Sequence, residues 1–268
     1  MAQGHHDLSF AAAAHDVAAA IHAHRKPGQR VILAGHSGGA PLMALVQTLY
    51  RAGDALALLA AHPSRADILR AWIDGAVRSD GSREPELDVY ATATPFGRTW
   101  VERYRLAQLE RIEHLAGLAS RALAEGDPER RLDAPHQFAD PRFVDFTLDE
   151  NERSSSAFKT PPATLNGEKA FMADGTTARA FFEQWYEPTS PANLIRLLPL
   201  VRVPVLHVVF GADHLVFPSQ SERIAAALPE GAERAHLSGA PHNPRPLPDK
   251  CEELARLLLS WSRRVLTQ

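Results

Sequence analysis

Residues 35–39, GHSGG, have the spacing G-x-S-x-G, with Ser37 at its centre. Between a strand and a helix, this spacing places the serine at a sharp, exposed turn at the end of a sheet. The glycines at positions 35 and 39 are expected there because a side chain would collide with the neighbouring strand and helix. A serine hydroxyl is a poor nucleophile at neutral pH, so it needs a base within hydrogen-bond reach and a carboxylate that orients the base. The spacing alone occurs by chance, so its meaning depends on those partners.

A carboxylate and a histidine of the required kind follow two later segments of the chain. Asp213 lies in GADHLVFP, directly after the apolar run VPVLHVVF, and His242 lies in SGAPHNP, directly after an expected strand around residues 234–237. The order Ser, Asp, His is the one expected when the serine occupies such a turn. The sequence therefore predicts Ser37 as nucleophile, Asp213 as acid and His242 as base.

The remaining histidines need separate interpretations, because the chain has 13 of them and some will follow a strand by chance. His207 falls inside an expected strand, where a core or hydrogen-bonded position is expected. His36, within the turn, and His62, after the apolar run at 55–61, are expected to border the substrate pocket. Asp67, a few residues further on, stays open as an alternative acid.

The two ends of the chain alternate between helical and strand-like patterns. The expected helices cover residues 8–25, 41–49, 219–227 and 249–265, and the expected strands cover residues 30–34, 55–61, 203–210 and 232–237. Such alternation is typical of a parallel sheet covered by helices, with right-handed crossovers. The sequence therefore predicts an α/β fold with a parallel sheet of about four strands.

The middle of the chain has a different character. Residues 64–195 are richer in arginine, glutamate and aromatic residues and show no clear strand pattern. Long and short helices are expected at 100–123 and 178–186, and the polar stretch 150–167 is expected to be a loop. We therefore expect a mostly helical inserted cap at 64–195 and a core formed by 1–63 and 196–268. Trp100 and Trp185 are candidates for an apolar substrate pocket, although positions in the core of the cap explain them equally well.

Composition argues against several classes of function. The 268 residues carry a formal net charge of −3, which gives no reason to expect nucleic acid or an anionic membrane as a partner. No basic leader precedes an apolar segment, and no apolar run approaches the roughly 20 residues of a membrane span. Cys251 is the single cysteine, so no intrachain disulfide can form. We expect a cytoplasmic protein that acts on a small molecule without a metal or organic cofactor.

The segments GHSGGA, GADHLVFP and SGAPHNP together resemble the α/β-hydrolase superfamily. The resemblance covers residues 8–62 and 200–265, with 64–195 in the place of that family's variable cap. Further segments, LLAAHPSRADILRAWIDGAV, RYRLAQLERI and FADPRFVDFTLD, resemble a group of capped bacterial α/β-hydrolases of unassigned substrate. The resemblance implies the same roles for Ser37, Asp213 and His242. It also implies that the backbone N–H of Gly38 stabilises the oxyanion.

The sequence departs from this family at its start. Members normally have four strands before the helix that leads into the serine turn, whereas this chain begins at that helix and residues 1–7 cannot form a strand. A second oxyanion donor normally comes from that region, and one lost donor typically costs on the order of 100- to 1000-fold in turnover. We therefore expect a truncated gene model or fragment, with a shortened protein as the alternative. Residues 31–35, VILAG, would then be an exposed apolar edge strand, open to pairing with a second copy in a homodimer.

Two functions from different classes follow from these observations. The first is a serine hydrolase that cleaves a small ester or a related acyl compound through an acyl-enzyme. Serine at position 37, where an aspartate would suggest epoxide or haloalkane chemistry, favours acyl transfer, but fold and triad do not choose between esters, amides, lactones and thioesters. The alternative is a truncated, weakly active or non-catalytic binding protein on a hydrolase scaffold. Nucleotide binding is disfavoured because neither G-x-G-x-x-G nor a phosphate-loop lysine is present.

Overall fold

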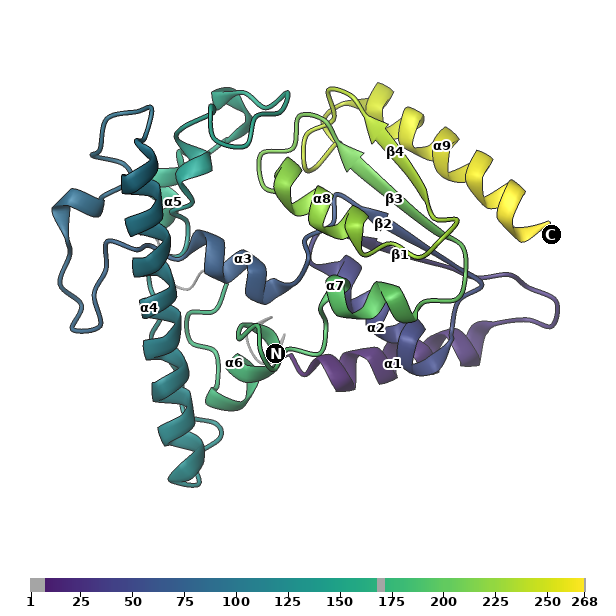
Figure 1. Cartoon of the computed structure of the whole chain (residues 1–268). Coiled ribbons are helices and arrows are strands. Elements are labelled where there is room, and N and C mark those ends of the chain that lie inside the picture. The colour runs from purple at the N-terminus through teal and green to yellow at the C-terminus, as the bar shows by residue number, and fades with distance from the viewer. Residues whose placement is uncertain (1–7, 168–171, 268) are drawn as a thin grey trace. The chain divides into compact units, whose positions relative to one another are not determined.

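The computed structural model describes residues 8–167 and 172–267, so the expectation for residues 1–7 lies outside the described residues. The described residues pack into two compact units, which are coloured by sequence position in Figure 1. We call them the sheet unit, with Phe10–Ser64, Asp149–Ala157 and residues 191–267, and the helical unit, with residues 8–9, 65–148, 158–167 and 172–190. The expected domain boundaries near residues 64 and 195 remain predictions. Residues 149–157, from the middle of the expected cap, group with the sheet unit.

The sheet unit contains a four-stranded parallel sheet in the order β1-β2-β3-β4, which confirms the predicted fold class. Its strands are β1 (Ile32–His36), β2 (Ala55–Leu59), β3 (Val205–Phe210) and β4 (Glu233–Leu237). β1 runs two residues further than expected, so that His36 belongs to the strand. Among the described strands, β1 pairs with β2 alone, which leaves it at an edge of the sheet. Pairing of this edge with a second copy stays a prediction.

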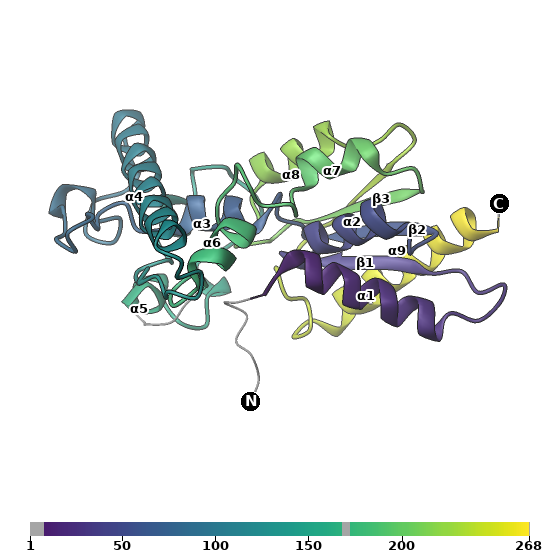
Figure 2. The same ribbon diagram turned by 90° about the horizontal axis from the view of Figure 1, so that it is seen from below.

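Helices cover both faces of the sheet. They are α1 (Phe10–His24), α2 (Gly39–Tyr50), α7 (Leu194–Leu197), α8 (Pro218–Ala226) and α9 (Pro248–Leu266). Buried Trp261 of α9 packs against one sheet face, on which Ala57 and Val208 lie. Gly35 of β1 faces the opposite side, where it meets the start of α2. α2 and α9 therefore cover opposite faces, and α1 packs alongside α2 (Figures 1 and 2).

His207 occupies a fully buried position in β3, as expected for a core histidine. Neither ring nitrogen has a hydrogen-bond partner among the described residues. Burial, and then the positive charge of Arg234, lowers the pKa of His207 to about 4. The ring is therefore neutral in the folded protein at neutral pH, and its protonation opposes folding.

We expect His207 to make the protein sensitive to acid. Its pKa is about 4 in the folded chain and about 6.5 in an unfolded one, so the unfolded state binds the proton more readily. The stability that this group contributes is complete above pH 6.5 and is lost as the pH falls toward 4, by about 3 kcal/mol in total. Urea unfolding at pH 7.5 and 4.5 should show a smaller loss of stability on acidification for His207→Leu than for the wild type. The exposed His24 supplies the control, His24→Leu, and equal losses in all three proteins would contradict the assignment.

The helical unit is built around one long helix. Its helices are α3 (Arg65–Trp72), α4 (Arg98–Ala124), α5 (Pro162–Gly167) and α6 (Ala178–Gln184). α4 and α6 correspond to the two helices expected here. The expectation of a loop throughout 150–167 was wrong, because α5 occupies its end. No helix in residues 8–167 and 172–267 combines the length and the apolar character that crossing a membrane requires.

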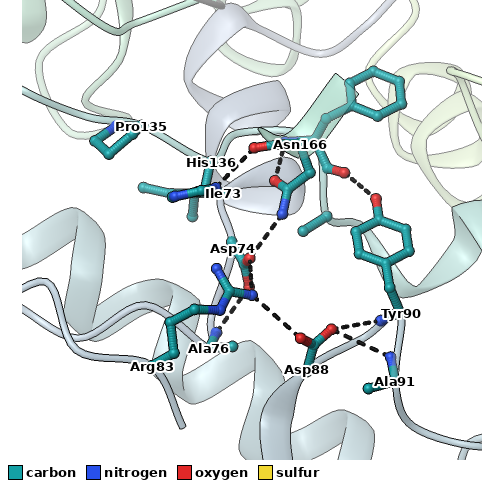
Figure 3. A network of polar contacts seen from close by, with 12 residues as sticks. Ile73, Asp74, Ala76, Arg83, Asp88, Tyr90, Ala91, Pro135, His136 and Asn166 are labelled. Carbon is teal, nitrogen blue, oxygen red and sulfur yellow. Dashed lines mark hydrogen bonds and ion pairs between the residues drawn. The ribbon is translucent and has the colours of Figure 1, made fainter. Parts of the chain in front are cut away.

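A buried polar network joins several segments of the helical unit (Figure 3). The side chain of Asp74, 1% exposed, accepts hydrogen bonds from Arg83 Nη2 at 3.0 Å and from Asn166 Nδ2 at 2.8 Å. The side-chain Oδ1 of Asn166 also accepts from the backbone N–H of Phe138, and the backbone carbonyl oxygen of Asn166 lies 2.8 Å from His136 Nδ1. A buried carboxylate is costly unless it is paired and hydrogen-bonded, so these contacts both satisfy Asp74 and hold α5 in place.

Candidate active site

Ser37 lies at the turn between β1 and α2, with a positive φ of 57°. Positive φ is uncommon for residues other than glycine and marks a strained backbone that the surroundings must hold. The Ser37 N–H donates to the carbonyl of Leu59 at 2.9 Å, and the Ser37 carbonyl accepts from Ala40 N–H at 3.2 Å. Contacts to β2 and to the first turn of α2 thus fix the conformation of Ser37.

The two outer glycines of G-x-S-x-G differ in what they do. A Cβ added to Gly35 would lie 2.4 Å from Ala40 Cα, a backbone atom that cannot move aside. A Cβ added to Gly39 would meet no described atom within 4 Å, and Gly39 has no positive φ. The expectation of a collision is therefore right for Gly35, which lets α2 approach β1. It is wrong for Gly39, where the helix has room for a side chain.

Ser37, His242 and Asp213 form a continuous chain of contacts in the sheet unit. His242 Nε2 lies 2.9 Å from Ser37 Oγ, and His242 Nδ1 lies 2.8 Å from Asp213 Oδ2. A carboxylate only accepts hydrogen bonds, so Nδ1 carries the proton and Nε2 is free to accept from the serine hydroxyl. The parallel strands β1, β3 and β4 all end at one edge of the sheet, which explains how residues 205 positions apart meet there.

Two backbone N–H groups also hold the carboxylate of Asp213. Its Oδ1 accepts the backbone N–H groups of Leu215 at 2.8 Å and Val216 at 2.9 Å, and the residue is 1% exposed. Hydrogen bonds to backbone donors fix the plane of a carboxylate, and so the direction in which it faces the histidine ring. His242 is itself 8% exposed. The pair is therefore largely shielded from water, which strengthens its electrostatic interaction.

Three other histidines surround His242 in the sheet unit. Ring centroids lie 4.8 Å away for His36, 5.9 Å for His62 and 6.4 Å for His214. Burial of the ring lowers the pKa of His36 and of His214, so both favour the neutral form beside His242. The backbone N–H of His62 donates to the Ser37 carbonyl at 3.4 Å. Pocket-lining roles for His36 and His62 stay predictions.

The remaining candidates are distributed over both units. Gly38 caps the N-terminus of α2, directly after Ser37. Asp67, the alternative acid, lies in the first turn of α3 in the helical unit. Trp100 stacks between Phe96 and Tyr104 in that unit, and Trp185 is buried in its apolar core. Trp185 is therefore a core residue, whereas Trp100 is only partly buried, and the role of both in a substrate pocket stays a prediction.

The segment 149–157 contributes site residues that the sequence did not indicate. Asn151 Nδ2 donates to the carbonyl of Asp213 at 2.7 Å. Glu152 accepts from Ser238 Oγ and the N–H of Gly239, on the loop that leads to His242, and its hydrogen bond with His236 lowers its pKa. This segment therefore joins the loop that carries Asp213 to the loop that carries His242. The polar composition of 150–167 indicated a loop, and no pattern in it pointed to these contacts.

No three His, Cys, Asp or Glu side chains in residues 8–167 and 172–267 are grouped as metal ligands would be. Ser37, His242 and Asp213 place a hydroxyl, an imidazole and a carboxylate in series, and their catalytic roles stay predictions.

Comparisons with known proteins agree with this fold. The sequence pattern of the alpha/beta hydrolase family matches residues 2–227, a range that includes Ser37 and Asp213 and ends before His242. Among curated protein sequences, none matches this chain. The alpha/beta hydrolase GrgF from Penicillium sp. sh18 is 10% identical and superposes with a TM-score of 0.56, covering 99% of this chain and 75% of its own.

Two further solved structures are similar at low sequence identity. DcsB, solved in complex with its substrate analogue, is 13% identical, with a TM-score of 0.51 over 99% of this chain and 76% of its own. A thermophilic esterase from Thermogutta terrifontis, with malate bound, is 17% identical, with a TM-score of 0.47 over 97% and 74% of the two chains. At such low identities, the superpositions of GrgF and DcsB bear on the fold alone. The family pattern covers most of the sequence, and the chain therefore belongs to the alpha/beta hydrolase family.

Proposed function

We propose that this protein is a serine hydrolase that cleaves small carboxylic esters or related acyl compounds through an acyl-enzyme. The observation that carries the proposal is the pair of contacts that His242 makes, at 2.9 Å to Ser37 Oγ and at 2.8 Å to Asp213 Oδ2. In this proposal, His242 is the base for the serine hydroxyl, and Asp213 orients its imidazole and stabilises the charged form. Membership of the alpha/beta hydrolase family supports the same conclusion.

In the proposed mechanism, Ser37 Oγ attacks the carbonyl carbon of the substrate while His242 Nε2 takes the hydroxyl proton. Asp213 keeps the ring in the tautomer that can accept this proton and stabilises the imidazolium that forms. The imidazolium then protonates the leaving group, and an ester bond joins the acyl group to Ser37. Water, activated by His242, cleaves this ester and restores the serine.

The tetrahedral intermediates of both steps carry a negative charge on the former carbonyl oxygen. The backbone N–H of Gly38 is our candidate donor to this oxygen, because it follows Ser37 directly and caps α2. The partial positive charge at the N-terminus of this 12-residue helix acts in the same direction. A hydrogen-bond donor aimed at the oxyanion stabilises the transition state more than the ground state, and so raises kcat.

The test is hydrolysis of short-chain p-nitrophenyl esters by the purified chain. We expect a burst of p-nitrophenol equal to the enzyme concentration whenever deacylation is slower than acylation. Ser37→Ala should lower kcat at least about 1000-fold, because neither His242 nor Asp213 can act without the nucleophile. Ser260→Ala, at an exposed position of α9, is the matched control and should retain full activity. Equal rates for Ser37→Ala and the wild type would refute the proposal.

A further inference from the structure

His36 lies next to the proposed nucleophile in sequence, at the end of β1. It pairs in register with Leu59, which packs in the cluster under α9, so the His36 ring lies on that face. There the ring contacts Phe210, with centroids 6.2 Å apart, and His242, with centroids 4.8 Å apart. The His36 ring is therefore placed to act on the loop that carries His242 rather than on the hydroxyl of Ser37.

A hydrogen bond joins His36 to the backbone of the base. His36 Nε2 lies 2.8 Å from the carbonyl oxygen of His242, and the two residues are 206 positions apart in the chain. A carbonyl oxygen can only accept, so the proton of the neutral His36 ring must be on Nε2. The bond fixes the tautomer of His36 and attaches the loop after β4 to the end of β1.

This bond and the contact between His242 and Ser37 connect the same two segments. Ser37 follows His36 directly and lies 2.9 Å from His242 Nε2, while His36 holds the His242 carbonyl. The hydrogen bond from His36 holds the backbone of His242, and the contact with Ser37 holds its ring. Asp213 orients the ring of His242 through Nδ1, but it does not hold the backbone of that residue.

The loop has little regular structure of its own to hold His242. Residues 238–247, between β4 and α9, form turns and bends without helix or strand. Ahead of His242, the Ala240 carbonyl accepts from Ala212 N–H at 3.0 Å, and beyond it the Pro244 carbonyl lies 3.4 Å from Cys251 Sγ. Between these two anchors, the hydrogen bond from His36 holds the backbone of His242 itself.

We infer that His36 is a positioning residue that holds the backbone of His242 so that its Nε2 stays within reach of Ser37 Oγ. The inference rests on the proposed function, because it assigns His36 a part in activating Ser37. A base displaced by about 1 Å can cost about 100-fold in rate, so a single backbone hydrogen bond can carry a large kinetic effect. The neutral state of His36, favoured by burial, adds no repulsion to the imidazolium that forms on His242.

The test compares His36→Phe, which keeps a flat ring without a donor, with His36→Gln, whose side-chain N–H₂ reaches the same position as Nε2. We expect His36→Phe to lower kcat for p-nitrophenyl esters about 100-fold with little change in KM, since the base is displaced and the substrate contacts are not. His36→Gln should recover most of the lost rate. Equal activity of all three proteins, or equal losses in both variants, would overturn the inference.

A second measurement does not depend on activity. The Nδ1–H proton of His242, shared with Asp213, should give a low-field proton NMR signal that is absent in His242→Ala. We expect this signal in the wild type and His36→Gln, and a signal broadened by exchange in a folded His36→Phe. An unchanged signal in His36→Phe would overturn the inference even if no ester is hydrolysed. If the wild type fails to turn over esters while the signal behaves as expected, the proposed function fails and the positioning of His242 stands.

Discussion

Replacing Asp213 with asparagine is expected to lower kcat for ester hydrolysis by about 10,000-fold while leaving the protein folded. The reason lies in how the side chain is held. The N–H groups of Leu215 and Val216 both donate to Oδ1, so an asparagine at this position must keep its amide oxygen there. Its N–H₂ group then faces His242 Nδ1, which must accept the hydrogen bond.

The consequence falls on the other nitrogen of the ring. With Nδ1 unprotonated, the neutral imidazole carries its proton on Nε2, the atom 2.9 Å from Ser37 Oγ. It can then only donate to the serine and cannot take its proton. Asp249→Asn, at an exposed position in the first turn of α9, is the matched control. A loss of less than tenfold in Asp213→Asn, measured on protein of unchanged circular dichroism, would show that Asp213 does not orient the base.

Replacing Gly35 with alanine is expected to destabilise the protein by about 3 kcal/mol, because the new Cβ would overlap the backbone of α2. The added atom would lie 2.4 Å from Ala40 Cα and 2.8 Å from the carbonyl oxygen of Gly39. Neither atom belongs to a flexible side chain, so β1 and α2 must separate. Ser37 lies between these elements, and its activity should fall together with the stability.

Gly39→Ala provides the matched control within the same five residues. Its Cβ would meet no described atom within 4 Å, and the position begins α2. Alanine favours helix by up to about 1 kcal/mol over glycine, so the free energy of unfolding should stay the same or rise slightly. Urea unfolding followed by circular dichroism distinguishes the two variants. Similar losses in Gly35→Ala and Gly39→Ala would contradict the close approach of β1 and α2.

The sheet, and the meeting of Ser37, Asp213 and His242 at its edge, could be predicted because short-range patterns specify them. Apolar runs marked the four strands, and a parallel sheet brings the ends of its strands to one edge, which is why Ser37, Asp213 and His242 could be named in advance. The need for glycine at position 35 also followed from the turn. For Gly39 the same expectation was wrong, because the G-x-S-x-G pattern does not tell how much room the fold leaves around each residue.

The supporting contacts could not be predicted, because nothing periodic marks them. Asn151 reaches Asp213 across 62 positions of the chain, and Asn166 reaches Asp74 across 92. Side-chain hydrogen bonds of this kind depend on the final fold and leave no trace in local composition. The hydrogen bond between His36 and the His242 carbonyl was likewise not indicated by the sequence, because it joins residues 206 positions apart.

The most direct test of the central claim, that Ser37 is an activated nucleophile, is labelling of the purified chain with a fluorophosphonate probe. Such probes react with serines whose hydroxyl is activated by a base, and peptide mass spectrometry then identifies the labelled residue. We predict one adduct on Ser37, no labelling of Ser37→Ala, and strongly slowed labelling of His242→Ala. A folded wild-type chain that stays unlabelled, or that carries the label on another serine, would contradict the claim.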